Sequence, residues 1–451
     1  MSRRTRVAVV GAGPAGAYAA AQLRASRARP DVDVFERLPT PWGLLRGGVA
    51  PDHQEIKALA DTFEAEVFGR GCRFFGGVEV GTDVHHADLM RHYHAVVYAV
   101  GARSDKTLGI ENEHLPGSLP ATDFVGWFNG HPDRRDLDPL LDVKRAVIIG
   151  NGNVAADVAR ILTRSVDELA RTDIADHALA ALRESRIEEV VVLGRRGPAQ
   201  AAFTSAELRE LGHMDGVELR VAPEEAELDL VSTEWLDEEG TFTARRNVKL
   251  LREFAAAAPQ AGARARIVLR FLRSPVALHG ASRVESIEIA RNVLSRDEAG
   301  TIRARTLDGE TETIECGLVL RSVGYRAVPL PGVPFDERNY VLPNDRGRVV
   351  DGDTRAVVPG VYAVGWIKRG PTGILGTNKR DAEETVARLL EDIDTLPDPP
   401  EAGDLPLPDH VSADGWRAID TTETSAGEAL DRPRVKLTTV DELVDAARQP
   451  A

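Results

Sequence analysis

Cysteine is scarce in this chain of 451 residues, which contains only Cys72 and Cys316. The two stand far apart and form no CxxC pair. The sequence therefore gives no support for a local redox disulfide, a zinc site or a cysteine-bound iron–sulfur cluster. We predict two ordinary buried thiols and no resident metal.

Basic residues are outnumbered, and long apolar runs are missing. The 56 Lys and Arg residues stand against 71 Asp and Glu residues, which gives a formal net charge of −15. Such a charge opposes general binding to nucleic acid or to an anionic membrane, but it is compatible with a local basic patch. The uncharged run from Val7 to Gln22 is too short to span a bilayer. We expect a cytoplasmic protein with neither nucleic acid nor a membrane as partner.

A dinucleotide-binding pattern opens the chain. The β-branched run Arg6–Val10 leads into Gly11-Ala-Gly-Pro-Ala-Gly16, and an alanine-rich helical stretch follows. Gly11 permits the tight turn, Gly13 lets a pyrophosphate approach the backbone, and Gly16 lets the helix pack on the strand. The helix N-terminus offers N–H groups to the phosphates. Glu36 ends a second short strand about twenty residues further on, where it can accept hydrogen bonds from a ribose.

The same pattern occurs a second time, with a different ending. A strand at Arg145–Ile149 leads into Gly150-Asn-Gly-Asn-Val-Ala155, and a later strand ends in Arg195 and Arg196. Arginines cannot accept a hydrogen bond from a ribose 2′-OH, but they pair well with a 2′-phosphate. We therefore expect the first site to hold a nucleotide with an unphosphorylated ribose, such as FAD, and the second to prefer NADP(H). A solvated turn at the arginine pair is the alternative.

The segments between and after these motifs suggest an inserted domain. Pro116–Asp142 is typical of an irregular crossing, and Gly216–Glu315 is typical of a β-rich extension of the second domain. Gly360–Asn378 then predicts a strand and glycine-rich loop that return to the first site. We predict an α/β fold of the glutathione reductase-like kind with two Rossmann-like domains. The FAD-binding domain is expected at residues 1–103 and 323–451, and the inserted NADP-binding domain at 104–322.

Two ionisable residues bear on chemistry. His53 ends a proline- and glycine-rich loop, Leu38–His53, which contains Trp42 and would cover a bound cofactor; the histidine could face a flavin. Glu207 lies at a helix entry after the arginine pair and could face a nicotinamide. A lone His or Glu is more often a structural hydrogen-bonding group, so the residues alone leave both interpretations open. Helical spacing follows at Gln54–Phe68, and short strands are predicted at Arg73–Phe75 and Val78–Val80.

Six stretches together resemble one enzyme family. They are Pro39-Thr-Pro-Trp-Gly-Leu-Leu-Arg46, Gly48-Val-Ala-Pro-Asp-His53, Gly150-Asn-Gly-Asn-Val-Ala155, Gly194-Arg-Arg-Gly197, Ala202-Phe-Thr-Ser-Ala-Glu-Leu-Arg-Glu-Leu211 and Gly365-Trp-Ile-Lys-Arg-Gly-Pro-Thr-Gly-Ile-Leu-Gly-Thr-Asn378. The chain is similar, from about Val7 onward, to the adrenodoxin reductase-like branch of the ferredoxin–NADP⁺ reductases, which includes the bacterial FprA type.

The resemblance implies a set of binding residues. For FAD these are Gly11, Gly13, Ala15, Gly16, Glu36, Leu44, Val80, Trp366, Gly373, Ile374 and Leu375. For NADP(H) they are Gly150, Asn151, Gly152, Asn153, Val154, Arg195, Arg196, Glu207 and Gly373. Ala15 stands where some relatives carry Ser, a change that a backbone contact survives. His53 and Glu207 would be the catalytic residues, which hold the ring geometry and relay protons.

The implied activity is that of an FAD-dependent ferredoxin–NADP⁺ reductase. Hydride would pass from NADPH to flavin N5, and single electrons would then pass, reversibly, to an iron–sulfur ferredoxin. Such partners are acidic, so docking requires a local basic face. Arg245, Arg246 and Lys249, together with Arg252, form the best cluster. Arg264, Arg266, Arg270 and Arg273 follow nearby, and an ordinary solvated face is the alternative.

Other functions stay open at this stage. The same nucleotides would serve an NADPH diaphorase or quinone reductase with a small acceptor. An electron-input subunit like the small subunit of glutamate synthase usually carries a cysteine-rich segment, which this chain lacks. A redox-sensing flavoprotein without turnover needs only one nucleotide site. No motif assigns a role to the segment that follows the Pro/Asp-rich linker 397–409.

Overall fold

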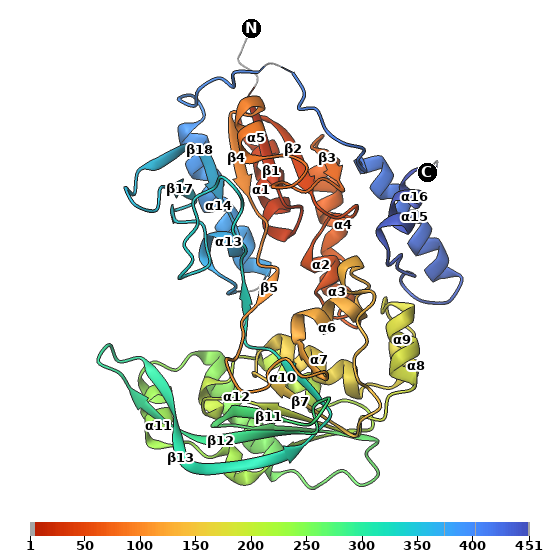
Figure 1. Ribbon diagram of the computed structural model, residues 1–451, viewed down its shortest axis with the longest axis vertical. Coiled ribbons are helices and arrows are strands. Elements are labelled where there is room, and N and C mark those ends of the chain that lie inside the picture. Colours follow the sequence, from red (N-terminus) through yellow and green to blue (C-terminus); the bar gives the residue numbers. More distant parts are fainter. Residues whose placement is uncertain (1–4, 374, 402, 450–451) are drawn as a thin grey trace. The chain divides into compact units, whose positions relative to one another are not determined.

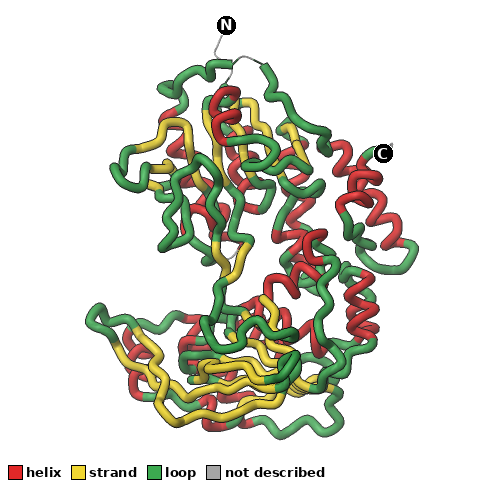
Figure 2. Tube along the Cα trace, viewed as in Figure 1, coloured by secondary structure: helices red, strands yellow, loops and turns green. Residues whose placement is uncertain are grey.

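The chain divides into two compact units (Figures 1 and 2). The computed structural model describes residues 5–373, 375–401 and 403–449. Unit 1 comprises Met1–Asp105, Asn129–Pro132 and Gly324–Ala451, and unit 2 comprises Lys106–Phe128 and Asp133–Val323. The chain leaves unit 1 through β5 (Ser104–Asp105) and returns through β15 (Tyr325–Arg326), and these two strands pair antiparallel.

Unit 1 is built on a sheet that has seven strands within the described residues. Their order is β16 (Asn344–Asp345), β17 (Arg348–Val350), β18 (Val357–Ala363), β4 (Ala95–Tyr98), β1 (Arg6–Val10), β2 (Asp31–Glu36) and β3 (Arg73–Gly76). The run from β18 to β3 is parallel, with Val9 beside both Val34 and Val97. Parallel strands of this kind are buried on both faces, which explains their continuous β-branched sequence.

Alternate residues of β1 enter two different cores in unit 1. Val7 and Val9 pack with residues of α1 (Pro14–Ala25) and α14 (Leu375–Asp392), whereas Ala8 and Val10 pack on the other face with α5 (His86–His92). The remaining helices are α2 (Leu44–Gly47), α3 (Gln54–Lys57), α4 (Leu59–Phe63), a π-helix (Glu64–Phe68), α13 (Trp366–Arg369), α15 (Ala413–Glu428) and α16 (Val440–Ala447). The predicted helix at Gln54–Phe68 is thus broken into short pieces. The predicted strand Val78–Val80 is wrong, because only an isolated bridge, Val80 to Val84, forms there.

Unit 2 carries a parallel sheet that has six strands in the described part of the chain. Their order is β6 (Ser118–Pro120), β14 (Leu318–Arg321), β7 (Arg145–Ile149), β8 (Glu189–Leu193), β10 (Ala265–Arg270) and β9 (Val217–Val221). Ala146 and Ile148 face a core of helices, while Val147 and Ile149 face the antiparallel sheet of β11 (Arg273–His279), β12 (Ser286–Arg296) and β13 (Ile302–Glu315). Figure 1 shows β12 and β13 as one long hairpin. The α/β fold with two dinucleotide-type sheets is therefore confirmed.

Two predictions about unit 2 need correction. The expected irregular crossing at Pro116–Asp142 contains β6 and α6 (Ala121–Phe128), because its aromatic residues Phe124, Trp127 and Phe128 fill the core. The expected β-rich segment also holds α11 (Leu230–Glu238) and α12 (Phe242–Ala256), whose N-termini are capped by the side chains of Asp229 and Thr241. The other helices of unit 2 are α7 (Asn153–Thr163), α8 (Val166–Leu169), α9 (Asp176–Arg183) and α10 (Ser205–Leu211).

Both cysteines lie in the cores, as the sequence predicts. Cys72 and Cys316 are free thiols, and burial raises the pKa of each to about 12. Thiols in this state are poor nucleophiles at neutral pH. Among the described residues, no helix is both long and apolar enough to cross a bilayer.

Candidate nucleotide-binding sites

The first glycine turn joins β1 to α1 in unit 1. Gly11 has φ +104, and a Cβ there would lie 2.6 Å from the carbonyl oxygen of Ala99. A Cβ on Gly16 would lie 2.0 Å from the Gly11 oxygen, so the close packing of α1 on the strand requires glycine. At Gly13 the nearest atom to an added Cβ is the Cα of Gly43, at 3.9 Å. The space at Gly13 fits a phosphate that approaches the backbone at the start of a helix.

Glu36 stands beside this turn at the end of β2. Its Oε2 accepts a hydrogen bond from the Ala12 N–H at 2.9 Å, and its Oε1 accepts one from the Leu38 N–H at 3.2 Å. Burial raises the pKa of Glu36, and these backbone hydrogen bonds act in the opposite direction. The carboxylate is held in place with lone pairs to spare, so it fits a ribose that donates hydroxyl hydrogens.

The loop Leu38–His53 lies directly on the first turn. The Trp42 N–H donates to the Ala12 oxygen at 2.9 Å, and an added Cβ on Gly43 would lie 2.9 Å from the Cα of Gly13. The Trp42 ring is only 3% exposed and packs on Phe63 and Phe68. The Trp42 side chain therefore anchors the loop in the core and is not available to cover a cofactor. Leu44, the first residue of α2, is 41% exposed and remains available to a ligand.

A second glycine-rich loop of unit 1 follows β18. Gly365 has φ +78 and donates its N–H to Asp381 Oδ2, and Asp381 also pairs with Lys368 at 2.9 Å and with Arg369 at 3.1 Å. The half-buried Trp366 ring lies 5.0 Å from the Tyr325 ring. Asp381 was not among the predicted site residues, because no local pattern reveals which backbone N–H a helix carboxylate will reach.

The other residues predicted for this loop and its neighbourhood have varied settings. Gly373 has φ +86, and Leu375 opens α14. Ile374 lies outside the described residues. Val80 is 8% exposed in the core, and the Ala15 Cβ lies 2.6 Å from where a Cβ on Gly365 would stand. Gly365 is thus needed for the approach of the late loop to α1.

The second glycine turn joins β7 to α7 in unit 2. Gly150 has φ +117, and an added Cβ would lie 2.1 Å from the Ser322 oxygen, whereas Gly152 has nothing within 4 Å of such an atom. The Asn151 oxygen accepts the Ala202 N–H at 3.1 Å, and Asn153 Oδ1 accepts the Thr204 N–H at 2.8 Å. The turn is therefore tied to the segment that enters α10. Val154, the next predicted residue, is half-buried.

Arg195 and Arg196 follow β8 with their backbone fixed and their charges unbalanced. The Arg195 oxygen accepts from Asn292 Nδ2 at 2.7 Å, and the Arg196 oxygen accepts from the Leu272 N–H at 3.1 Å. Burial and the neighbouring charge of Arg195 lower the pKa of Arg196. No carboxylate of the described chain forms an ion pair with either guanidinium. Such a pair fits a dianionic group such as a 2′-phosphate.

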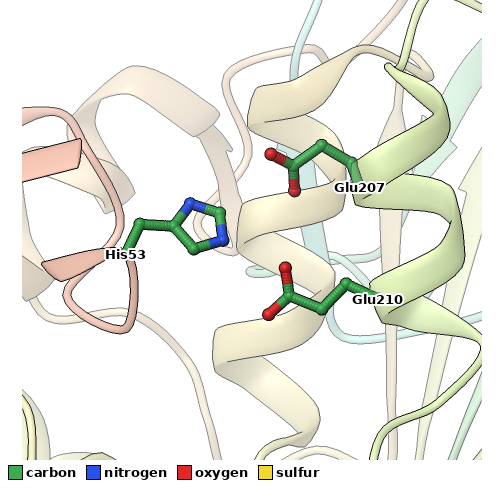
Figure 3. Close-up of side chains that lie close together, drawn as sticks. All are labelled: His53, Glu207 and Glu210. Carbon is green, nitrogen blue, oxygen red and sulfur yellow. The ribbon is translucent and has the colours of Figure 1, made fainter. Parts of the chain in front are cut away.

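Glu207 is half-buried and lies in an ionic cluster around the buried Arg160, which the sequence does not predict. Figure 3 shows Glu207 and Glu210 one turn apart on α10. Arg160, fully buried on α7, reaches Glu207 Oε2 at 3.1 Å, Glu210 Oε1 at 3.4 Å and Asp157 Oδ1 at 2.6 Å. The buried Arg160 guanidinium thus contacts both α10 carboxylates, and Arg164 Nη2 also reaches Glu210 Oε1 at 3.2 Å. Nothing in the local sequence marks Arg160, which sits on an otherwise apolar helix face.

His53, also drawn in Figure 3, belongs to unit 1. The side chain is half-buried. The backbone N–H of His53 donates to the Ala50 oxygen at 3.0 Å, and its backbone oxygen accepts from the Ile56 N–H at 3.1 Å. The turn thus fixes the backbone of His53 at the start of α3. Leu44 and His53 stand near the two ends of the α2–α3 part of the loop.

The fold and the two glycine turns define a class: an oxidoreductase with one dinucleotide unit inserted into another. Residues 5–221 match the family described as pyridine nucleotide-disulphide oxidoreductase. The chain is 47% identical to the NADPH-ferredoxin reductase FprA of Mycobacterium tuberculosis, over 97% of this chain and 98% of that protein. It is 41% identical to the mitochondrial NADPH:adrenodoxin oxidoreductase of Arabidopsis thaliana, over 99% of this chain and 96% of that protein.

A solved structure agrees with these relatives. The structure of Mycobacterium tuberculosis FprA in complex with NADPH has a TM-score of 0.90 to this chain, with 46% identity, and covers 99% of this chain and 100% of that one. The chain belongs to the NADPH-ferredoxin reductase family that includes FprA and adrenodoxin reductase. The predicted family resemblance is confirmed.

Proposed function

We propose that this chain is an FAD-dependent NADPH–ferredoxin reductase. The observation that carries the proposal is the Arg195–Arg196 pair, which ends the second nucleotide unit with two cations that no described carboxylate neutralises. Relatives of similar length bear the names NADPH-ferredoxin reductase and NADPH:adrenodoxin oxidoreductase. When bound, FAD supplies the step between a two-electron donor and a one-electron acceptor.

Unit 1 would hold the FAD. Gly11, Gly13 and Gly16 shape the turn for the pyrophosphate, and Glu36 accepts the ribose hydroxyls. Ala15, Leu44, Val80, Trp366, Gly373, Ile374 and Leu375 complete the proposed contacts. The Asp381 hydrogen bond to the Gly365 N–H holds the late loop in position for this role.

Unit 2 would hold the NADP(H). Gly150, Gly152 and Val154 surround the pyrophosphate, while Asn151 and Asn153 keep the turn joined to the segment before α10. Arg195 and Arg196 bind the 2′-phosphate. Glu207 is proposed to contact the nicotinamide end, in a position fixed by Arg160. His53 is proposed to face the flavin; both residues orient the rings and hold or release protons, since hydride transfer itself needs no general base.

The ferredoxin is proposed to dock near α12. Arg246 is exposed and has no described carboxylate partner, and Arg245 donates only to the carbonyls of Leu236 and Asp237, so both keep their charge. Lys249 lies 3.8 Å from Glu253. By contrast, Arg266, Arg270 and Arg273 pair with glutamates, and Arg264 donates to the Thr163 oxygen. The proposed basic face is therefore that of α12, with Arg245, Arg246, Lys249 and Arg252, all of which are exposed.

The activity test is NADPH-driven reduction of cytochrome c by the purified protein, with and without an added ferredoxin. We expect strong stimulation by the ferredoxin and a much slower rate with NADH. Fast quinone reduction without a ferredoxin effect would favour a diaphorase instead. The proposed compartment is the cytoplasm, where NADPH is maintained.

The docking test reverses charge on α12. Arg245→Glu with Arg246→Glu should slow ferredoxin reduction by about tenfold or more at low salt, and it should leave ferricyanide reduction unchanged. Arg305→Glu, an equal charge change per residue at an exposed position of β13, is the control. Equal slowing of both acceptors, or an equal effect of Arg305→Glu, would refute the docking site.

A further inference from the structure

The C-terminal segment, residues 411–449, is fastened to unit 1 at several points. Val411 and Gly76 exchange backbone hydrogen bonds at 2.8 Å beside β3. Ser412 and Thr439 directly precede helices α15 and α16, and their side chains cap the helix N-termini. The apolar residues Trp416 and Ile419 enter the same core as α1 and α14. The segment is thus part of the folded unit.

A buried carboxylate lies at the centre of this attachment. Glu423 on α15 is fully buried, and its two oxygens accept from Arg46 Nη1 at 2.8 Å and Nη2 at 2.5 Å. Arg434 and the Leu437 N–H also donate to it, at 3.1 and 2.9 Å. The charge of Arg46 is the main attraction that keeps the pKa of Glu423 low against the effect of burial. A two-pronged Arg–carboxylate contact fixes direction as well as distance.

Arg46 belongs to α2, inside the loop that lies on the first glycine turn. The same loop donates from Trp42 to Ala12 and brings Gly43 against Gly13. Lys436 Nζ lies 3.4 Å from the Arg46 oxygen, and the Arg46 guanidinium stands 5.6 Å from the Trp416 ring centre. The C-terminal segment therefore binds the middle of the loop at Arg46, two positions after Leu44.

A second tether of α15 provides the comparison. Arg417 Nε reaches Glu64 Oε1 at 2.8 Å, and Trp416 Nε1 reaches Glu64 Oε2 at 3.2 Å. Glu64 lies in the π-helix and not in the loop. This tether holds the same helix to unit 1 without touching the segment that covers the glycine turn.

We propose that the Arg46–Glu423 pair is a clasp with which the C-terminal segment holds the loop Leu38–His53 closed over the dinucleotide of unit 1. The proposal rests on the proposed function, in which that nucleotide is FAD. Arg46 acts as a positioning residue: it fixes the loop that carries Leu44 and His53, and it thereby sets how long the nucleotide is retained.

The test compares FAD release from the purified holoproteins. Wild type, Arg46→Met, Glu423→Gln and Arg417→Met are diluted, and dissociation is followed by the rise of free flavin fluorescence. Loss of a charge-assisted contact should speed release by about tenfold to a hundredfold in Arg46→Met and Glu423→Gln. Arg417→Met, which removes the ion pair of the second tether and leaves the Trp416 contact to Glu64, should release FAD within about twofold of wild type.

Two further readouts separate the clasp from general damage. All measurements are made at a temperature where far-UV circular dichroism shows each variant fully folded. The KM for NADPH should stay within about twofold of wild type, since its proposed contacts lie in unit 2 except Gly373, which is outside the loop Leu38–His53. The clasp would be refuted if Arg46→Met and Glu423→Gln released FAD at the wild-type rate. It would also be refuted if Arg417→Met released FAD as fast as these two variants. Wild-type protein that binds no FAD would instead refute the proposed function.

Discussion

The two glycine turns share the strand–turn–helix arrangement, but they differ in how tightly the helix packs on the turn. In unit 1, Gly16 must be glycine, because an added Cβ would lie 2.0 Å from the Gly11 oxygen. In unit 2 the same place holds Ala155, whose methyl group is fully buried without displacement of the helix. The helix of unit 1 is therefore pressed more closely on its turn than the helix of unit 2.

The side chains proposed to recognise the nucleotides also differ: Glu36 is held by hydrogen bonds within the protein, whereas Arg195 and Arg196 have no described ion-pair partner. Both oxygens of Glu36 already accept backbone N–H groups, so this carboxylate, the proposed ribose acceptor, is held in place by the protein itself. Arg195 and Arg196 have no described carboxylate partner, so they are balanced only when an anion binds. Unit 1 is also covered by a loop that touches Gly13, whereas an added Cβ on Gly152 would meet nothing within 4 Å. A closed site suits a retained cofactor, and an open, charged site suits a nucleotide that exchanges.

The largest effect should come from removing the charge of the open site. Arg195→Ala with Arg196→Ala would delete the two proposed charge-assisted contacts to the 2′-phosphate, each of about 1.5–3 kcal/mol. We expect the ratio of kcat/KM for NADPH to that for NADH to fall by about a hundredfold or more, mainly through the NADPH value. Steady-state kinetics with both nucleotides measures it. An unchanged ratio would show that Arg195 and Arg196 do not select NADPH, and the proposed difference between the two nucleotide sites would be refuted.

A smaller effect should follow from exchanging the packing residues of the two turns. Gly16→Ala forces α1 away from its strand and should cost about 1–3 kcal/mol of unfolding free energy, with loss of bound flavin. The reciprocal change, Ala155→Gly, removes one buried methyl and should cost about 1 kcal/mol without flavin loss. Urea unfolding and flavin content of the two variants test this. Equal flavin loss would show that the turns are built alike.

The ionic cluster of unit 2 should give a coupling of intermediate size. If Arg160 acts by fixing Glu207, then Arg160→Gln and Glu207→Gln should not be additive. We expect a coupling of about 1–2 kcal/mol in kcat/KM for NADPH. The four proteins of the cycle are compared by stopped-flow flavin reduction. The pair Arg160 and Glu210 is the matched cycle, and a coupling as large there would assign Arg160 a purely structural role.

The smallest effect concerns acid and the buried carboxylate of unit 1. Because the folded state lowers the pKa of Glu423, its contribution to stability is complete above the unfolded value of about 4.3 and is lost as pH falls through the folded pKa. Glu423→Gln should therefore lose stability at pH 7 and show a shallower further loss below pH about 4. Urea unfolding at several pH values measures the slope. If the unfolding free energy fell equally steeply with acid in wild type and variant, protonation of Glu423 would not contribute to the loss of stability.

The sequence was sufficient where the fold depends on short, local patterns. Both strand–turn–helix units, and the positions of Glu36 at the end of β2 and of the arginine pair after β8, could be predicted, because glycine spacing and the strand pattern specify them. The core role of Trp42 and the helix α6 could not, because an aromatic residue in a proline-rich stretch gives the same local signal whether it covers a ligand or fills a core. Arg160 and the Arg46–Glu423 pair were missed for another reason: long-range ion pairs leave no periodicity.

The paired strands β5 and β15 have a consequence for how such proteins are assembled. They carry the chain out of unit 1 and back into it side by side, and within unit 2 the nearby strands β6 and β14 are neighbours as well. The inserted part thus has adjacent ends, and it is interrupted where Asn129–Pro132 returns to unit 1. Transplantation of residues 106–323 between reductases would exchange the proposed NADP(H) unit and leave the strands of the unit 1 sheet in place. It would also carry over Asn129, whose Oδ1 accepts hydrogen bonds from Lys57 and Lys436 of unit 1.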